Sequence, residues 1–95
     1  MTDYRITYWQ DIPAMVTARD GSTTAKAGLP DRFQEAIDRA AMEQDLMGSE
    51  AYLEQWRYGD WIVAEGSPDE VVAAVARQLD ADYPPERLDE LVVAR

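Results

Sequence analysis

Two runs near the start of the chain, Tyr4–Gln10 and Ala14–Arg19, alternate with a period of two, which is typical of β-strands. In Tyr4–Gln10, aromatic and β-branched side chains recur along the run, and such residues are enriched in strands. Ala14–Arg19 alternates again, after an interruption at Pro13, which lacks the N–H group that a strand ladder needs. Asp20 and Gly21 form a turn pair that ends the second run. The pattern predicts a hairpin of two strands.

The next part of the chain predicts a loop followed by a helix. Gly21–Gly28 is small and polar, which is typical of a loop. Pro30 and Asp31 suit the first turn of a helix, which we expect to end near Gln44. Apolar residues at helical spacing form one stripe along it, made of Phe33, Ala36, Ile37, Ala40 and Ala41. Ser49 can cap a short helical segment at Glu50–Gln55.

The second half predicts a strand and a second long helix. The strand covers Tyr58–Glu65, and Gly66 ends it. Ser67, Pro68 and Glu70 form a capping box with proline at the first helical position, so we expect a helix from there to about Ala81. Glu86–Val93 fits a short terminal helix, although its last three residues also fit an edge strand. We favour the helix.

This order of elements is strand, strand, helix, strand, helix, plus a short C-terminal element. It predicts an α+β domain with two layers, in which two amphipathic helices cover one face of an antiparallel sheet of about three strands. The length of 95 residues fits a single domain, 1–95, with 84–95 as a loosely attached terminal segment. The other sheet face must carry aromatic residues, so it is either a partner surface or covered by Tyr83–Arg95.

The charge balance narrows the range of partners. The chain has 19 acidic and 9 basic residues, for a net charge of -10. Such a charge repels phosphate backbones and anionic lipids, so we expect neither a nucleic acid nor a membrane as partner. Solubility is the simplest purpose of the acidity. The chain has no cysteine and no charged-then-apolar leader in residues 1–10, which predicts a cytoplasmic protein.

The sequence contains no histidine and no cysteine, and this absence excludes several kinds of metal site. It excludes zinc, haem-histidine and iron–sulfur sites, and we predict no metal, no cofactor and no catalytic residue. The acids of the first helix are interleaved with Arg32 and Arg39, as on an ordinary solvated helix face. Lys26, the single lysine, lies in the predicted loop and is interpreted as an exposed ammonium. Whether the protein is an enzyme stays open, and we favour a non-catalytic role.

The most unusual stretch is Trp56–Trp61. Trp, Tyr and Arg dominate the energetics of binding surfaces, but the same residues also make good core anchors in a small domain. Trp56 suits the core better, whereas Trp61 and Arg57 suit the core and a surface about equally. The candidate binding residues are Trp9, Gln10, Asp11, Trp56, Arg57, Asp60 and Trp61.

Three sequence blocks carry a resemblance to a known family. They read YWQDIPA at Tyr8–Ala14, LPDRFQEAIDRAAM at Leu29–Met42 and YLEQW at Tyr52–Trp56. Together they resemble the small bacterial domain family labelled virulence factor, in which the domain occurs alone or as the tail of a HEAT-repeat protein called conserved virulence factor C. The resemblance implies a bacterial module whose relatives work attached to, or beside, larger proteins. It implies no catalytic residue.

Three functions follow as hypotheses. The first is an accessory module that binds a larger protein through the aromatic sheet face and the Trp56–Trp61 segment. The alternative is a small-ligand-binding protein or a small metal-independent enzyme, with a pocket at Trp9, Arg57, Asp60 and Trp61. The third is a homodimer that buries the sheet face against its own copy.

Overall fold

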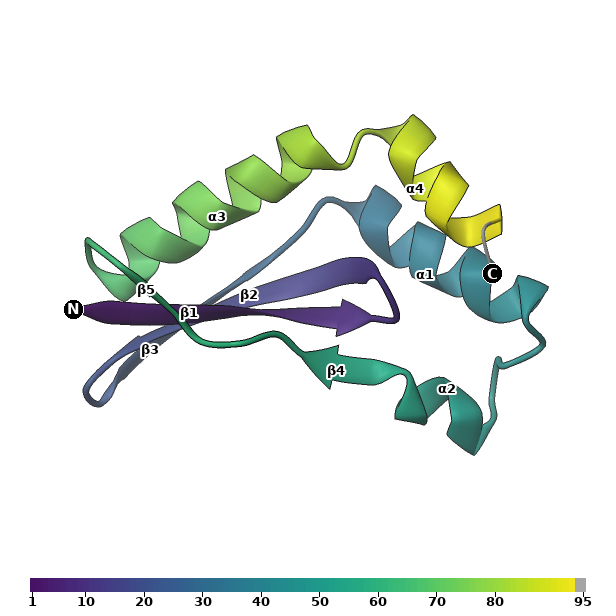
Figure 1. Cartoon of the computed structure of the whole chain (residues 1–95), viewed down its shortest axis with the longest axis horizontal. Helices are drawn as coiled ribbons and strands as arrows, with labels where there is room; N and C mark the ends of the chain where they lie inside the picture. The colour runs from purple at the N-terminus through teal and green to yellow at the C-terminus, as the bar shows by residue number, and fades with distance from the viewer. Residues whose placement is uncertain (94–95) are drawn as a thin grey trace.

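Five antiparallel strands form one sheet, and helices gather on one of its faces (Figure 1). The computed structural model describes residues 1–93. The α+β class predicted from the sequence is confirmed, although the sheet has five strands where about three were expected. The elements in chain order are β1 (Thr2–Trp9), β2 (Ile12–Asp20), β3 (Thr23–Gly28), α1 (Asp31–Glu43), α2 (Glu50–Glu54), β4 (Trp56–Tyr58), β5 (Ile62–Ala64), α3 (Pro68–Asp82) and α4 (Pro85–Val93).

The central strand is β1. It pairs with β2 on one side, and on the other side its two halves pair with β4 and with β5. The prediction of a single strand at Tyr58–Glu65 is therefore wrong, because two short strands, β4 and β5, occupy this region. Between them, residues 59–61 leave the ladder, although the Gly59 N–H still donates to the carbonyl of Ile6 at 2.8 Å.

The segment predicted as a loop at Gly21–Gly28 is the edge strand β3. It pairs with β2 from Thr23 opposite Asp20 to Gly28 opposite Met15. The inward side chains, Ala25 and Ala27, pack under α3 beside Val16 and Ala18 of β2. Backbone pairing and this packing hold the strand, because after its two threonines the side chains have little strand propensity.

The core consists of two clusters. Trp9 and Ile12, at the end of the hairpin, pack against α1 and α4. The buried residues of α1 are the five of the predicted stripe. The second cluster lies between the sheet and α3, where Val16 and Ala18 meet Val71, Val72 and Leu79.

The C-terminal segment forms helix α4, as favoured from the sequence. Leu88 is 1% exposed and Val92 is 4% exposed, and both join the cluster formed by α1. Up to Val93, the segment that we expected to be loosely attached is therefore packed, while residues 94–95 lie outside the described part. This packing places α4 on α1, so α4 does not cover the opposite sheet face.

The capping box predicted at the start of α3 is confirmed. The Glu70 N–H donates to the Ser67 hydroxyl at 3.2 Å, and the Ser67 N–H donates to the Glu70 carboxylate at 3.1 Å. The hydrogen bond from the Ser67 backbone is the main reason that the pKa of Glu70 lies below its ordinary value. The hydrogen bond therefore adds to the free energy of unfolding above the ordinary pKa of a glutamate, and this stabilisation is lost as the pH falls through the lowered pKa of Glu70.

We expect Ser67→Ala to lower the free energy of unfolding by about 1 kcal/mol at pH 7, because the first turn of α3 loses its side-chain acceptor. Urea denaturation followed by circular dichroism measures the change. Ser22→Ala is the control, since Ser22 lies exposed in the β2–β3 turn and should change stability by less than about 0.5 kcal/mol. Equal effects of the two substitutions would contradict the role of the cap.

Candidate functional site

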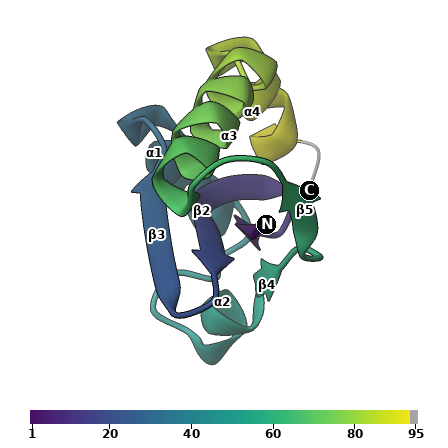
Figure 2. The ribbon, with the colours of Figure 1, turned by 90° about the vertical axis from the view of Figure 1, so that its left-hand side faces the viewer.

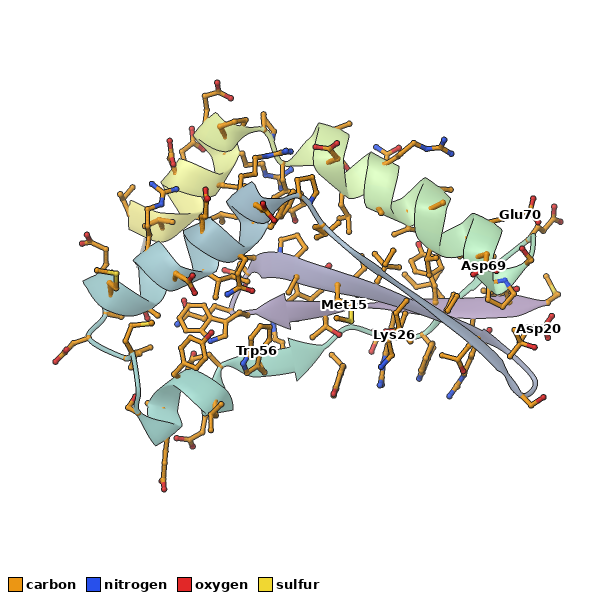
Figure 3. The ribbon with its side chains drawn as sticks, turned by 180° about the vertical axis from the view of Figure 1, so that it is seen from behind. Met15, Asp20, Lys26, Trp56, Asp69 and Glu70 are labelled. Atoms are coloured by element: carbon orange, nitrogen blue, oxygen red, sulfur yellow. The ribbon has the colours of Figure 1, made fainter. Side chains whose placement is uncertain are left out.

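One face of the sheet is left uncovered by the described helices. Figure 2 shows α1, α3 and α4 together on one side of the strands, and α2 lies beyond the Trp9 end of β1 (Figure 1). In Figure 3 the Lys26 side chain points away from these three helices. We call the uncovered surface the open sheet face, and the strand registers and aromatic contacts assign it Asp3, Arg5, Thr7, Met15, Thr17, Arg19, Thr24, Lys26, Tyr58, Trp61 and Val63.

The centre of the open sheet face is the guanidinium group of Arg5. Its carbon lies 3.9 Å from the ring centroid of Tyr58 and 4.6 Å from that of Trp61. Its Nε atom is buried and has no hydrogen-bond partner within residues 1–93. Contact with two aromatic rings attracts the cation and limits its rotamers, so the side chain is held in place before any partner arrives.

Trp61 contacts a second arginine. The guanidinium carbon of Arg19 lies 3.7 Å from the Trp61 ring centroid. Arg19 also forms an ion pair with Asp3, in which the nitrogen and oxygen are 3.9 Å apart and both side chains are largely exposed. Such a long, exposed pair contributes little to stability, so Arg19 stays available to another anion.

A third cation belongs to the same surface. Arg5 stands opposite Thr17, and Thr17 stands opposite Lys26, so one row crosses β1, β2 and β3. Arg19 follows Thr17 by two positions and is therefore the diagonal neighbour of Arg5, at a typical separation of about 7–8 Å. Within the described residues, Lys26 forms no ion pair or hydrogen bond. An acidic chain thus gathers three bases on one surface.

Gly59 allows the aromatic residues to reach this surface. A Cβ atom at this position would lie 3.2 Å from the carbonyl oxygen of Ile6, closer than a side chain tolerates without a shift of β1. The glycine therefore lets the chain run close along β1 between β4 and β5. Tyr58 and Trp61, on either side of this passage, both contact the guanidinium group of Arg5.

Two of the candidate residues from the sequence belong to the core. Trp9 is 0% exposed, and its indole N–H donates to the carbonyl of Tyr52 at 2.9 Å. Trp56 packs edge-on against the Tyr52 ring, with 6.3 Å between centroids, and is partly buried at the same cluster. Both tryptophans fix α2 and β4 to the hairpin.

Three further candidates tie the β1–β2 turn to its neighbours. Gln10 has a positive φ of 54°, and its side-chain amide exchanges hydrogen bonds with Gln44 at 2.7 and 2.9 Å. The Arg57 Nε donates to the Gln10 carbonyl at 2.9 Å, and Arg57 lies 3.6 Å from the Asp11 carboxylate. These contacts connect the β1–β2 turn to the end of α1 and to β4.

Arg57 also lies over the ring of Tyr8, with 4.4 Å from its guanidinium carbon to the ring centroid. Burial, and then the nearby Tyr83, raise the pKa of the Tyr8 phenol, while Arg57 acts in the opposite direction. Tyr8 is therefore neutral at physiological pH and does not serve there as a base.

The sequence predicted a binding surface on the aromatic sheet face, but the individual candidate residues chosen from it include few residues of the open sheet face. Of its seven candidate residues, Trp61 lies on this face, and Asp60 is its exposed neighbour. Arg5, Arg19, Lys26 and Tyr58 were not chosen. Arg5 and Arg19 occupy the polar phase of the two alternating strands, and this phase was the available signal that they face away from the helices.

Three of the four residues of the alternative pocket have separate sets of neighbours. Trp9 lies in the core, Arg57 contacts Tyr8, and Trp61 contacts Arg5 and Arg19. Two grooves in the described part of the chain lie away from these four residues, one between α1 and α4 and the other between β1 and α3. Within residues 1–93, no group of three or more acidic, histidine or cysteine side chains is placed to hold a metal ion. In the same part of the chain, no helix has the length and apolar character needed to cross a membrane.

Comparisons with known proteins place the chain among its relatives. The sequence model of a protein family described as "Virulence factor" matches residues 7–92. The chain is also similar to YpgR of Bacillus subtilis (strain 168), which is described as uncharacterized, with 36% identity over 85 residues and 87% of this chain covered. The match covers 21% of YpgR, so the chain spans about a fifth of that protein's length. No solved structure matches the chain.

Proposed function

We propose that this chain, which belongs to the virulence factor family, is a non-catalytic interaction module that binds a larger protein through the open sheet face. The family was recognised from three sequence blocks, and the matched residues 7–92 confirm it. The observation that carries the proposal is the exposure of large side chains around an ordered arginine. Tyr58 is 66% exposed and Val63 is 60% exposed, on the face that the described helices leave uncovered.

The composition of the open sheet face supports this role. Arginine, tyrosine and tryptophan are the residues that most often carry binding energy at protein interfaces. Here one of each lies in contact at the centre of the face, with Arg5 between Tyr58 and Trp61. Because this contact already restricts Arg5 and its neighbours, a partner would lose less conformational entropy on binding them.

The length of the relative also supports an association with larger proteins. The matched part is 21% of YpgR, so in that protein the equivalent segment is joined to a much longer chain. We propose that the present chain meets its larger partner in a bacterial cytoplasm, in keeping with its lack of cysteine.

The charge of the open sheet face argues against pairing with a second copy. A two-fold dimer whose axis passes through the centre of this face would bring Arg5, Arg19 and Lys26 of one copy close to the same three cations of the other. Like charges at such an interface are unfavourable. We therefore favour a different protein as the partner.

The test uses the whole chain as immobilised bait, with cross-linking to the partner before washing. We expect Tyr58→Ser/Val63→Ser to lose at least about tenfold of the captured partner, because two exposed apolar contacts are removed. Met42→Ser/Leu53→Ser is the matched control, since these residues are similarly exposed but lie on α1 and α2.

Equal capture by both double variants would show that the partner binds elsewhere and would defeat the proposal. Sedimentation velocity of the chain at two concentrations separates self-association from binding to another protein. A dimer that the Tyr58→Ser/Val63→Ser variant cannot form would identify the partner as a second copy.

A further inference from the structure

We propose that the segment bound by the open sheet face is acidic, an extended stretch of a partner protein whose Asp or Glu side chains contact Arg5, Arg19 and Lys26. This inference rests on the proposed function, and it adds the chemistry of the partner. An acidic partner is the opposite of what the net charge of -10 would attract on average.

The first argument is the separation of charge within the molecule. Of the five described arginines outside this face, three lie close to an acid: Arg32 lies 2.6 Å from Asp80, Arg39 lies 2.6 Å from Asp89, and Arg57 lies 3.6 Å from Asp11. On the open sheet face, by contrast, the one ion pair found within residues 1–93 is the long contact of Arg19 with Asp3.

The imbalance on this face is informative because acids outnumber bases by 19 to 9 in the whole chain. Arg77 on α3 and Arg87 on α4 also have no carboxylate ion pair among the described residues, but they lie on two different helices, and Arg87 donates to the backbone carbonyl of Asp82 at 2.8 Å. Arg5, Arg19 and Lys26 instead converge, which a random scatter of bases over an acidic surface does not explain.

The second argument is the way in which Arg5 is presented. Its guanidinium carbon lies 3.9 Å and 4.6 Å from two ring centroids, and these rings attract the cation without supplying a carboxylate or carbonyl acceptor for its N–H donors. Nε alone is buried without a partner, so the two terminal nitrogens remain at the surface, and no hydrogen bond to residues 1–93 occupies them. A carboxylate accepts two parallel bonds from a guanidinium group.

The third argument is spacing. Arg5 and Arg19 are diagonal neighbours, with about 7–8 Å between such positions, and Lys26 is two strands from Arg5, at about 10 Å. Alternate residues of an extended peptide are about 6.5–7 Å apart and lie on one side of it. Two carboxylates at alternate positions of an extended peptide therefore have the spacing of Arg5 and Arg19. A further carboxylate of the same peptide can reach Lys26.

Nucleic acids offer anions too, but the surroundings of the patch disfavour them. A long polyanion would extend beyond three cations over a chain whose remaining surface is strongly acidic. Phosphate contacts to three cations would release few counterions, so they would give a weak electrostatic gain. A short acidic peptide segment can contact the cations without covering the acidic surroundings.

The test follows backbone amide NMR shifts of the whole chain during titration with a blocked octapeptide, (Glu-Thr)4. We expect shifts confined to the open sheet face, and Arg5→Gln/Lys26→Gln should weaken binding by at least about tenfold. Arg39→Gln/Arg77→Gln is the control, because it changes net charge equally and should alter binding less than about twofold. Circular dichroism checks that both variants are folded.

The control ligands and the capture assay give results that can contradict the acidic-partner proposal. Equal binding of the neutral peptide (Gln-Thr)4, or equal losses in the two variants, overturns it, as does tighter binding of a thymidine octanucleotide to the same face. The capture assay then separates the two proposals. If Tyr58→Ser/Val63→Ser loses the natural partner while Arg5→Gln/Lys26→Gln retains it, the acidic partner is refuted and the interaction module stands. If both retain it, both proposals fall.

Discussion

Replacing Trp9 by alanine is expected to lower the free energy of unfolding by about 3–5 kcal/mol, the usual cost of removing a fully buried large aromatic residue. Trp9 is 0% exposed and packs among residues of β2, α1 and α4. Its indole also donates to the Tyr52 carbonyl, which anchors α2. Because a domain of this size has roughly 5–15 kcal/mol of stability, the variant should lose a large part of it in urea denaturation.

Two companion variants make the Trp9 result specific. Trp9→Phe keeps most of the packing but loses the hydrogen bond to Tyr52, so we expect a smaller loss of about 1–2 kcal/mol. Trp61→Ala removes a ring that contacts Arg5 and Arg19 on the surface, and it should also cost no more than about 1–2 kcal/mol. If Trp9→Ala were as mild as Trp61→Ala, Trp9 would be free to line a ligand pocket, as the alternative function requires.

The helices were predictable because their signals are local. The stripe from Phe33 to Ala41 repeats at helical spacing, and the Ser67–Glu70 capping box lies within four residues of sequence. In both places the structure has the predicted arrangement. Hydrophobic stripes and caps depend on neighbours within one or two turns of the same helix, so sequence alone contains the information.

Strand β3 was not predictable in this way. Its residues, TTAKAG, are small or polar, and they match a loop as well as a strand. The strand forms because β2 offers a free edge and α3 covers Ala25 and Ala27. Neither β2 nor α3 can be inferred as a partner from the residues of β3 alone. Tertiary context decides strand formation in such cases.

The sequence predicted an aromatic sheet face, but the cations on it were missed for a related reason. The sequence placed an aromatic and arginine cluster at Trp56–Trp61, but the arginines that contact Trp61 come from β1 and β2. Lys26 could join them only once β3 was known to be a strand. Pairing between strands, which no periodicity reveals, therefore decides the chemistry of this surface.

This assembly also changes the meaning of the net charge. The value of -10 is an average over the chain, whereas the open sheet face gathers Arg5, Arg19 and Lys26. Contact between proteins depends on local charge complementarity, while the average charge governs solubility and long-range repulsion. A partner of the same overall sign can therefore bind, provided that its acidic segment is short enough to stay within the patch.

Leu88→Ala is the second substitution expected to be costly, at about 2–5 kcal/mol of unfolding free energy. Leu88 is 1% exposed and lies between α4 and α1, beside Phe33 and Ile37 in the same cluster. Its loss leaves a cavity at the contact that holds the C-terminal helix, so urea denaturation should show the change in a single transition. Val93→Ala, on the exposed side of the same helix, should change stability by less than about 0.5 kcal/mol. Similar small effects at both positions would mean that α4 is only loosely attached, and the C-terminal segment would then be free to compete for the open sheet face.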